Sequence, residues 1–196
     1  MATPHDTVCG VVLAGGRSRR MGQPKQTLTW PDARGDRITW LDHARRRLSE
    51  VCAVVRVSGE EDLPDTVPDQ PGPLAGIAAA LETSPASRCL FLPVDMPLVT
   101  RAELVPLLEA QTPHAAYQGS LFPLCLQVSA ATLAQVRRRL AHPAPGQRSV
   151  HLLLRDFESQ VTWLRGSEAR LRNINSPEEL ASVSPSADTE LKENTP

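Results

Sequence analysis

The fold is decided near the start of the chain, where residues Val11–Lys25 read VVLAGGRSRRMGQPK. The apolar residues Val11–Leu13 suit a buried β-strand. Gly15 and Gly16 follow at once, and because they lack a Cβ they permit positive φ angles and let a ligand approach the backbone closely. Such a turn, with a helix start beyond it, presents backbone N–H groups to an anion. We therefore predict a triphosphate-binding loop at the carboxyl end of the first strand.

Basic side chains strengthen this prediction. Positive charge follows the two glycines, where a phosphate would lie, and comes from Arg17, Arg19, Arg20 and Lys25. The segment is not a Walker loop, because Lys25 is followed by Gln26, and its glycine spacing does not match the dinucleotide-binding fingerprint. A plain glycine-rich turn with a solvated basic face is the alternative interpretation.

Length and charge limit the class of protein. A chain of 196 residues is expected to form one domain. Its formal net charge of −1 argues against a general nucleic-acid-binding protein. No segment approaches the roughly 18 apolar residues that span a bilayer, and the start of the chain lacks the pattern of a secretory signal. We therefore expect a cytoplasmic protein that binds neither nucleic acid nor membrane.

Cysteines and arginine runs are assigned structural roles. The four cysteines are widely spaced and include no Cys-x-x-Cys pair, so they are predicted to be small buried core residues rather than zinc ligands or disulfides. They are Cys9, Cys52, Cys89 and Cys125. The runs Arg45–Arg47 and Arg137–Arg139 lie between apolar residues at helical spacing, and we interpret both as solvated helix faces.

Strand and helix patterns alternate along the chain. Beyond the first strand, strands are expected at residues 51–57, 66–68, 89–94 and 161–164, and as a pair within 115–128. Helices are expected at residues 38–51, 72–81, 101–110, 133–140 and 150–157, and from residue 177. Residues 28–40 look polar and turn-rich. This alternation predicts an α/β sandwich with a largely parallel sheet, formed by one domain over residues 1–182 and followed by a disordered tail over 183–196.

An acidic residue is expected beside the phosphate loop. Asp95 directly follows the apolar run Cys89–Val94, which is typical of a central strand covered on both faces. Ligands of such folds bind outside the carboxyl ends of the strands, so Asp95 and the loop after the first strand belong to the same edge. Triphosphate chemistry usually needs Mg²⁺, for which one or two carboxylates suffice. Asp95 is therefore a candidate magnesium ligand, and the alternative is an acid that caps the following turn.

Four separated segments resemble the molybdenum cofactor guanylyltransferase family, and they span most of residues 8–182. These segments are the opening LAGG…RMG…K, DQPGPLAG at residues 69–76, LPVDMP at residues 92–97 and NINSPEEL at residues 173–180. The first and third are shared with related cytidylyltransferases and sugar nucleotidyltransferases. The second and fourth are more specific. In the family, the Leu-x-Gly-Gly loop and the Gly-Pro-Leu-Ala-Gly loop line the guanine pocket, and both have the guanine-type form here. The resemblance implies a Rossmann-like three-layer sandwich with a mixed, mostly parallel sheet, of the nucleotide-diphospho-sugar transferase type.

The resemblance also implies a reaction. GTP and molybdenum-bound molybdopterin would give the guanine dinucleotide cofactor and pyrophosphate. Catalysis would fall to Arg20, Lys25 and Asp95, with Mg²⁺ held by Asp95. GTP binding would fall to Leu13, Ala14, Gly15, Gly16, Lys25, Asp69, Gly76 and Asp95. Asn173 and Asn175 would lie on the acceptor side. Molybdenum-insertion proteins and molybdoenzyme chaperones would be further partners, and the chain is expected to be a monomer.

The sequence departs from the family pattern in places that bear on the acceptor. Many relatives carry Asp where Pro24 stands, and Leu121–Leu124 lacks a His-Pro pair that some relatives have. An asparagine expected near the end of the second strand is replaced here by the Val57-Ser58 region. Two alternatives therefore stay open. One is a molybdopterin cytidylyltransferase or another small-molecule NTP transferase, and the other is a GTP-binding module without catalysis.

Overall fold

The computed structural model describes residues 7–14, 25–31, 35–59, 63 and 72–183. A six-stranded sheet runs through this part of the chain in the order β4-β1-β5-β7-β6-β8. Its strands are β1 (Val8–Leu13), β4 (Val54–Ser58), β5 (Arg88–Pro93), β6 (His114–Tyr117), β7 (Ser120–Gln127) and β8 (Val161–Leu164). Only β7 of these strands runs against the others, because it pairs antiparallel with both β5 and β6. The sheet is therefore mixed and mostly parallel, as predicted.

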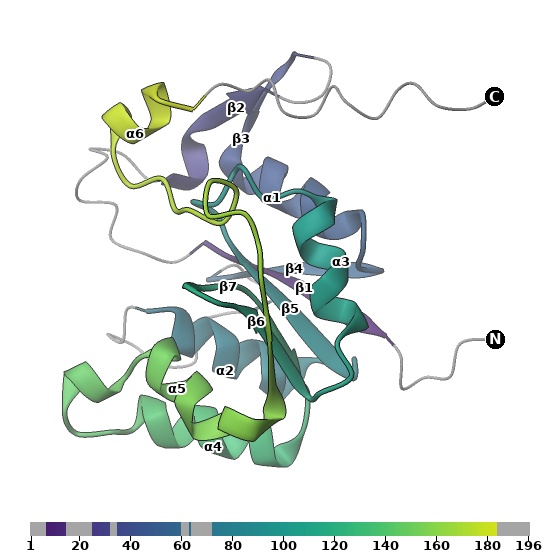
Figure 1. The fold of residues 1–196 in the computed structure, drawn as a ribbon, viewed down its shortest axis with the longest axis vertical. Coiled ribbons are helices and arrows are strands. Elements are labelled where there is room, and N and C mark those ends of the chain that lie inside the picture. Colours follow the sequence, from purple (N-terminus) through teal and green to yellow (C-terminus); the bar gives the residue numbers. More distant parts are fainter. Residues whose placement is uncertain (1–6, 15–24, 32–34, 60–62, 64–71, 184–196) are drawn as a thin grey trace.

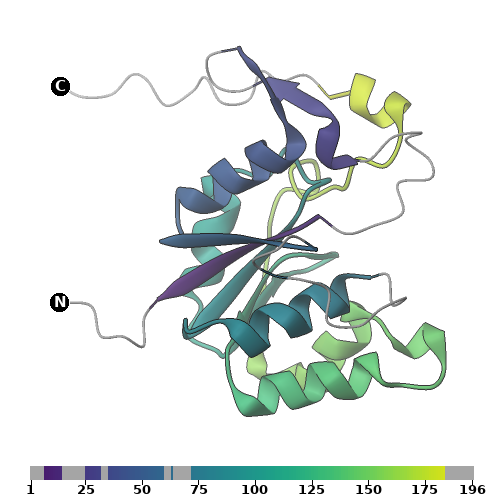
Figure 2. The same cartoon turned by 180° about the vertical axis from the view of Figure 1, so that it is seen from behind.

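Helices cover both faces of the sheet and give three layers (Figures 1 and 2). One face carries α1 (Trp40–Ser49) and α3 (Arg101–Glu109). The other carries α2 (Pro73–Thr83), α4 (Ala130–Leu140) and α5 (Val150–Phe157). The fold class predicted from the sequence is confirmed. Among the described residues, no helix combines the length and the apolar character needed to cross a membrane.

Local sequence signals explain where several helices begin. Pro73 occupies the first turn of α2, where its missing N–H would have no partner. Thr100 and Glu103 form the predicted capping box of α3, in which the Thr100 N–H donates to the Glu103 carboxylate at 2.9 Å. Ser176 caps the short helix α6 (Pro177–Ala181) by accepting a hydrogen bond from the Glu179 N–H at 3.2 Å. These helices begin within a residue of their predicted starts.

The stretch expected to be turn-rich contains more structure than its composition indicates. After a single 3₁₀ turn at Lys25–Thr27, the chain forms the antiparallel strands β2 (Thr29–Pro31) and β3 (Arg37–Thr39), and α1 follows β3 in sequence. Trp30 of β2 is buried. Each strand has only three residues, which is too short for an alternating pattern to be recognised. The predicted strand at residues 66–68 and the tail beyond residue 183 lie outside the described residues.

The four cysteines are buried, as predicted, and lie in the core on and around the central strands. Burial raises the pKa of the Cys52 thiol to about 12 and that of Cys125 to about 11, so both stay protonated at neutral pH. The interpretation of Arg137–Arg139 as a solvated face is wrong for Arg139. Its side chain is 16% exposed and forms a bidentate ion pair with Asp156 of α5, because α4 packs against α5 along that face.

His114 is a buried titratable group in the strand layer. Its side chain is 1% exposed, and its ring lies 4.0 Å from the Phe157 ring, centroid to centroid. Burial, together with the nearby charge of Arg88, lowers the pKa of His114 from 6.5 to about 4. The imidazole is therefore neutral at pH 7 and opposes protonation in the folded state.

We predict that this histidine makes the protein less stable in mild acid. The unfolded chain takes up the proton first as the pH falls below 6.5, so the contribution of neutral His114 is complete above that pH and is lost toward pH 4. The loss amounts to roughly 3 kcal/mol. Urea unfolding measures the free energy of unfolding of the wild type and of His114→Gln at pH 7 and at pH 4. Between these pH values the wild type should lose more unfolding free energy than the variant. An equal loss in the two proteins would contradict the prediction.

Candidate active site

Three segments far apart in sequence meet at one edge of the sheet. Lys25 begins the 3₁₀ turn after the phosphate-loop segment, Asp95 follows β5, and Asn175 precedes α6. The Lys25 Nζ atom lies 2.7 Å from Asp95 Oδ2 and donates to Asn175 Oδ1, also at 2.7 Å. The first two residues were predicted to share this edge, and the structure brings them into direct contact.

The topology of the sheet explains this meeting point. β1 and β5 are parallel neighbours that end in register, with Leu13 opposite Pro93. From β1 the chain continues through α1 to β4 on one side, whereas from β5 it continues to β6 and β7 on the other side. The connections from β1 and from β5 therefore lead to opposite sides of the sheet, and ligands of open α/β sheets bind beside such a reversal of strand order.

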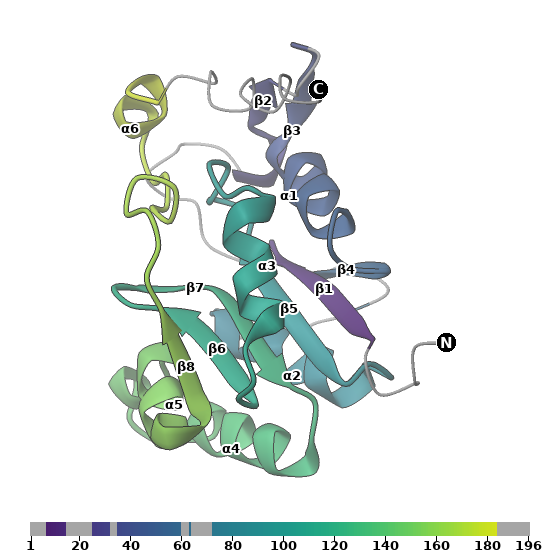
Figure 3. The same cartoon turned by 45° about the vertical axis from the view of Figure 1, so that its right-hand side comes forward.

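Backbone hydrogen bonds fix the turn that carries Asp95. The Val94 N–H donates to the Leu13 carbonyl at 3.1 Å, which ties the ends of β5 and β1 together. The Ile174 N–H donates to the Asp95 carbonyl at 2.8 Å and places the segment before α6 across the turn. Figure 3 shows this segment running from β8 past the sheet to α6. Two different parts of the chain therefore hold the backbone on either side of the Asp95 carboxylate.

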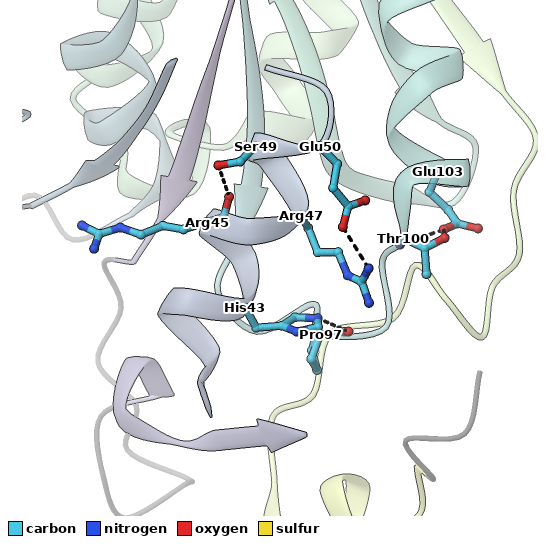
Figure 4. Close-up of polar contacts among 8 residues, drawn as sticks. All are labelled: His43, Arg45, Arg47, Ser49, Glu50, Pro97, Thr100 and Glu103. Carbon is cyan, nitrogen blue, oxygen red and sulfur yellow. Dashed lines mark hydrogen bonds and ion pairs between the residues drawn. The ribbon is translucent and has the colours of Figure 1, made fainter. Parts of the chain in front are cut away.

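A histidine of α1 supports the same turn from the helix layer that α1 and α3 form (Figure 4). His43 of α1 is 5% exposed, and its Nε2 lies 2.9 Å from the Pro97 carbonyl oxygen. A carbonyl only accepts hydrogen bonds, so Nε2 carries a proton and acts as the donor. Trp30 packs edge-on against the His43 ring, with 6.3 Å between the ring centroids. The sequence analysis gave His43 no role, and the structure assigns it to holding the turn two residues after Asp95.

The carboxylate of Asp95 is only partly satisfied. Its side chain is 16% exposed, and Oδ2 contacts Lys25. Oδ1 is buried and has no hydrogen-bond partner among the described residues. A buried carboxylate oxygen without a partner is unfavourable by about 1–3 kcal/mol or more. The atom is therefore a natural position for a cation or a donor brought by a ligand.

The side chain of Lys25 is held between an anion and an amide. It is 15% exposed, so its charge is poorly solvated, and Asp95 and Asn175 contribute to stabilising it. Asn175 was predicted to lie on the acceptor side, and the structure adds the contact with Lys25, which the sequence did not indicate. Asn173 is exposed and lies two residues before Asn175. The acceptor role of both asparagines stays a prediction.

Gly76 has a packing role that the sequence analysis missed. A Cβ at this position of α2 would lie 2.9 Å from Ser58 Cβ, closer than real Cβ contacts come, and 3.1 Å from Leu13 Cδ2, which is tighter than most. The glycine therefore lets α2 approach the ends of β1 and β4 at the edge that carries the site. Leu13 is buried, and Ala14 is partly exposed at the end of β1. Their predicted contacts with a nucleotide stay predictions.

Several predicted site residues lie outside the described part of the chain. They are Gly15, Gly16, Arg20 and Asp69. Among the described residues, no group of three or more His, Cys, Asp or Glu side chains could hold a metal by itself. A cavity of about 510 Å³ between α4, α5 and β8 includes Arg139, Asp156 and Trp163 in its lining. None of its lining residues belongs to the Lys25–Asp95 site.

Comparison with a family model and with a curated relative points to the same family. Residues 10–159 match the sequence model of the MobA-like NTP transferase domain. A molybdenum cofactor guanylyltransferase from Xanthomonas euvesicatoria is 32% identical to this chain, over 87% of the chain and 90% of the relative.

Two solved structures share the fold. The molybdopterin-guanine dinucleotide biosynthesis protein A from Archaeoglobus fulgidus has a TM-score of 0.58 and 19% identity, covering 88% of this chain and 95% of its own. A 2-C-methyl-D-erythritol 4-phosphate cytidylyltransferase from Thermus thermophilus also has a TM-score of 0.58 and 19% identity, covering 87% and 94%. The fold is therefore common to transferases with different names and does not by itself identify the nucleotide.

We predict that Gly76→Ala destabilises the protein by about 1–3 kcal/mol, because the added methyl group overpacks the contact with Ser58. The double variant Gly76→Ala/Ser58→Gly should recover part of this loss, since it removes the atoms that the new Cβ meets. Gly146→Ala serves as the matched control, because a Cβ there has no atom within 4 Å. Chemical denaturation of the four proteins measures these differences. An unchanged stability of Gly76→Ala would contradict the packing role.

Proposed function

Since this chain belongs to the MobA-like NTP transferase family, we propose that it transfers GMP from GTP to molybdenum-bound molybdopterin and releases pyrophosphate. The name of the Xanthomonas relative supports the reaction. The single observation that carries the proposal is the contact of Lys25 with Asp95 beside the carboxyl ends of β1 and β5. A cation and an anion held at this point suit a substrate that brings both a triphosphate and a metal ion.

The reaction asks mainly for positioning and charge neutralisation. A phosphate oxygen of the acceptor forms a bond to the α-phosphorus of GTP, while the bond from that phosphorus to the bridging oxygen breaks and pyrophosphate leaves with it. Negative charge grows on the departing pyrophosphate. The Lys25 ammonium can donate hydrogen bonds to these oxygens, since it is fixed by Asp95 and Asn175 beside the end of the phosphate-loop segment. Arg20 is proposed to add positive charge there.

The residues at the site fit a divalent cation. Asp95 Oδ1 is a hard oxygen ligand without a partner among the described residues, and Mg²⁺ typically uses one or two carboxylates together with substrate phosphates and water. We therefore propose Asp95 as the magnesium ligand. When bound, the ion would neutralise triphosphate charge and so favour departure of pyrophosphate. The Ile174 and Val94 hydrogen bonds hold the backbone of this ligand in place before any substrate arrives.

The residues proposed to contact the nucleobase and the acceptor are identified from the sequence resemblance rather than from contacts in the structure. We propose that Leu13, Ala14, Gly15, Gly16, Asp69 and Gly76 shape the nucleotide site, and that Asn173 and Asn175 face the acceptor. A cytidylyltransferase is the second candidate, because a cytidylyltransferase shares the fold. The guanine-type form of the opening loop and of Gly72–Gly76 favours GTP. A monomeric state, a cytoplasmic location and contacts with molybdenum-insertion proteins and molybdoenzyme chaperones are further parts of the proposal.

The choice of nucleotide can be measured directly. Purified protein with molybdenum-loaded molybdopterin should release pyrophosphate with MgGTP much faster than with MgCTP. A clear preference for CTP would replace the guanylyltransferase with the second candidate. Binding of GTP without pyrophosphate release from any molybdopterin acceptor would favour a non-catalytic module.

The role of Asp95 gives a second measurement. Asp95→Ala should lower turnover by about 10²–10³-fold, comparable to the loss of one preorganised charge stabiliser. It should also weaken the binding of Mn²⁺ in the presence of GTP, which electron paramagnetic resonance measures without turnover. Glu168→Ala, an exposed carboxylate on the segment after β8, is the control and should behave as the wild type. Near-normal activity of Asp95→Ala would show that the metal is held elsewhere.

A further inference from the structure

Glu179 of α6 connects the surface of the molecule to the site through Asn175. The Asn175 N–H donates to Glu179 Oε2 at 2.6 Å, and the Glu179 N–H donates to Ser176 Oγ at 3.2 Å. The carboxylate therefore holds the backbone of the residue whose side chain binds Lys25. We propose that Glu179 is a positioning residue for Lys25 and acts through Asn175.

Two hydrogen bonds fix the backbone at Asn175. Its N-terminal neighbour Ile174 is buried and donates its N–H to the Asp95 carbonyl at 2.8 Å. Its own N–H is held by Glu179. With the backbone fixed at these two points, the amide oxygen of Asn175 is directed at the Lys25 ammonium, 2.7 Å away. Glu179, Asn175, Lys25 and Asp95 thus form one continuous series of hydrogen bonds and ion pairs.

The far end of α6 is also anchored. The Arg172 guanidinium donates from Nη2 to Ser182 Oγ at 2.9 Å and to the Glu179 carbonyl at 3.4 Å. Leu180 packs against the core, although none of the five residues of α6 is buried. The helix thus adds little core area. Its polar contacts converge instead on the Arg172–Ser176 segment, which indicates that α6 serves to place that segment across the Asp95 turn.

Two readings of Glu179 must be separated. Glu179 lies in the first turn of α6, so a change there disturbs the helix, and its carboxylate holds the Asn175 N–H, so a change there releases Lys25. Ser176→Ala removes the hydroxyl that accepts from the Glu179 N–H but leaves the Glu179–Asn175 hydrogen bond intact. This variant loses the N-cap hydrogen bond of α6 without touching the series that leads to Lys25, which makes it the matched control.

The chain contains only two lysines, Lys25 and Lys192, so lysine provides a specific probe of the site. In protein labelled with ¹³C and ¹⁵N on lysine alone, an ammonium held by Asp95 and Asn175 gives two distinct Hε proton signals, because rotation of its side chain is restricted. We expect this pattern for Lys25 in the wild type and in Ser176→Ala. In Glu179→Ala the two Hε signals should merge, and Glu179→Gln, which keeps an acceptor oxygen, should restore them. Lys192 gives an internal reference in each sample.

The effect on catalysis rests on the proposed function. Glu179→Ala should lower kcat for GMP transfer about tenfold, with a smaller change in KM for GTP, whereas Ser176→Ala and Glu179→Gln should stay near the wild type. If the wild type transfers no GMP but the lysine signals respond as expected, the proposed function fails and the positioning role stands. If Glu179→Ala keeps distinct Hε signals, or Ser176→Ala loses them equally, the positioning role is overturned.

Discussion

The ion pair between Lys25 and Asp95 is the interaction on which the rest of the site depends. Each side chain is about one-sixth exposed, so each charge has lost most of its water and needs the other. Either charge alone would be unfavourable at this edge of the sheet, and together they create a position that is polar and fixed before a substrate arrives. Within the described part of the chain one oxygen of this carboxylate also stays without a partner, which suits the proposed metal ion. The same two residues therefore provide both the ion pair and the proposed metal ligand.

The scaffold around this pair is built from close approaches of backbone. β1 and β5 end together, the Val94 N–H links their ends, and Gly76 lets α2 approach the ends of β1 and β4 from one face. His43 of α1 supports the following turn from the other face. The first two contacts join neighbouring strands of the sheet, and the other two join a helix layer to the sheet or to the turn after it, so elements of the core position Asp95. A rigid base of this kind suits a reaction that relies on alignment.

Much of this arrangement follows from the sequence, and the remainder does not, for physical reasons. Apolar runs, Pro73 and the Thr100–Glu103 box are local signals, so the sheet, the helix starts and the common edge of Lys25 and Asp95 could be predicted. The β2–β3 hairpin was missed because strands of three residues carry no periodicity. The contact of Asn175 with Lys25 spans 150 positions of the chain, and no local pattern records such a pairing. The same holds for His43 with Pro97, and for the space that Gly76 leaves to Ser58.

The separation of Lys25 from Asn175 has a consequence for how the protein is made. During synthesis β1 and β5 leave the ribosome long before Asn175, which lies 150 positions after Lys25. The two strands can thus pair before Lys25 gains this hydrogen-bond partner. Chains that end before Asn175 would keep the β1–β5 pair but lack the Lys25–Asn175 contact. The order of synthesis therefore leaves the seating of Lys25 to a late step of folding.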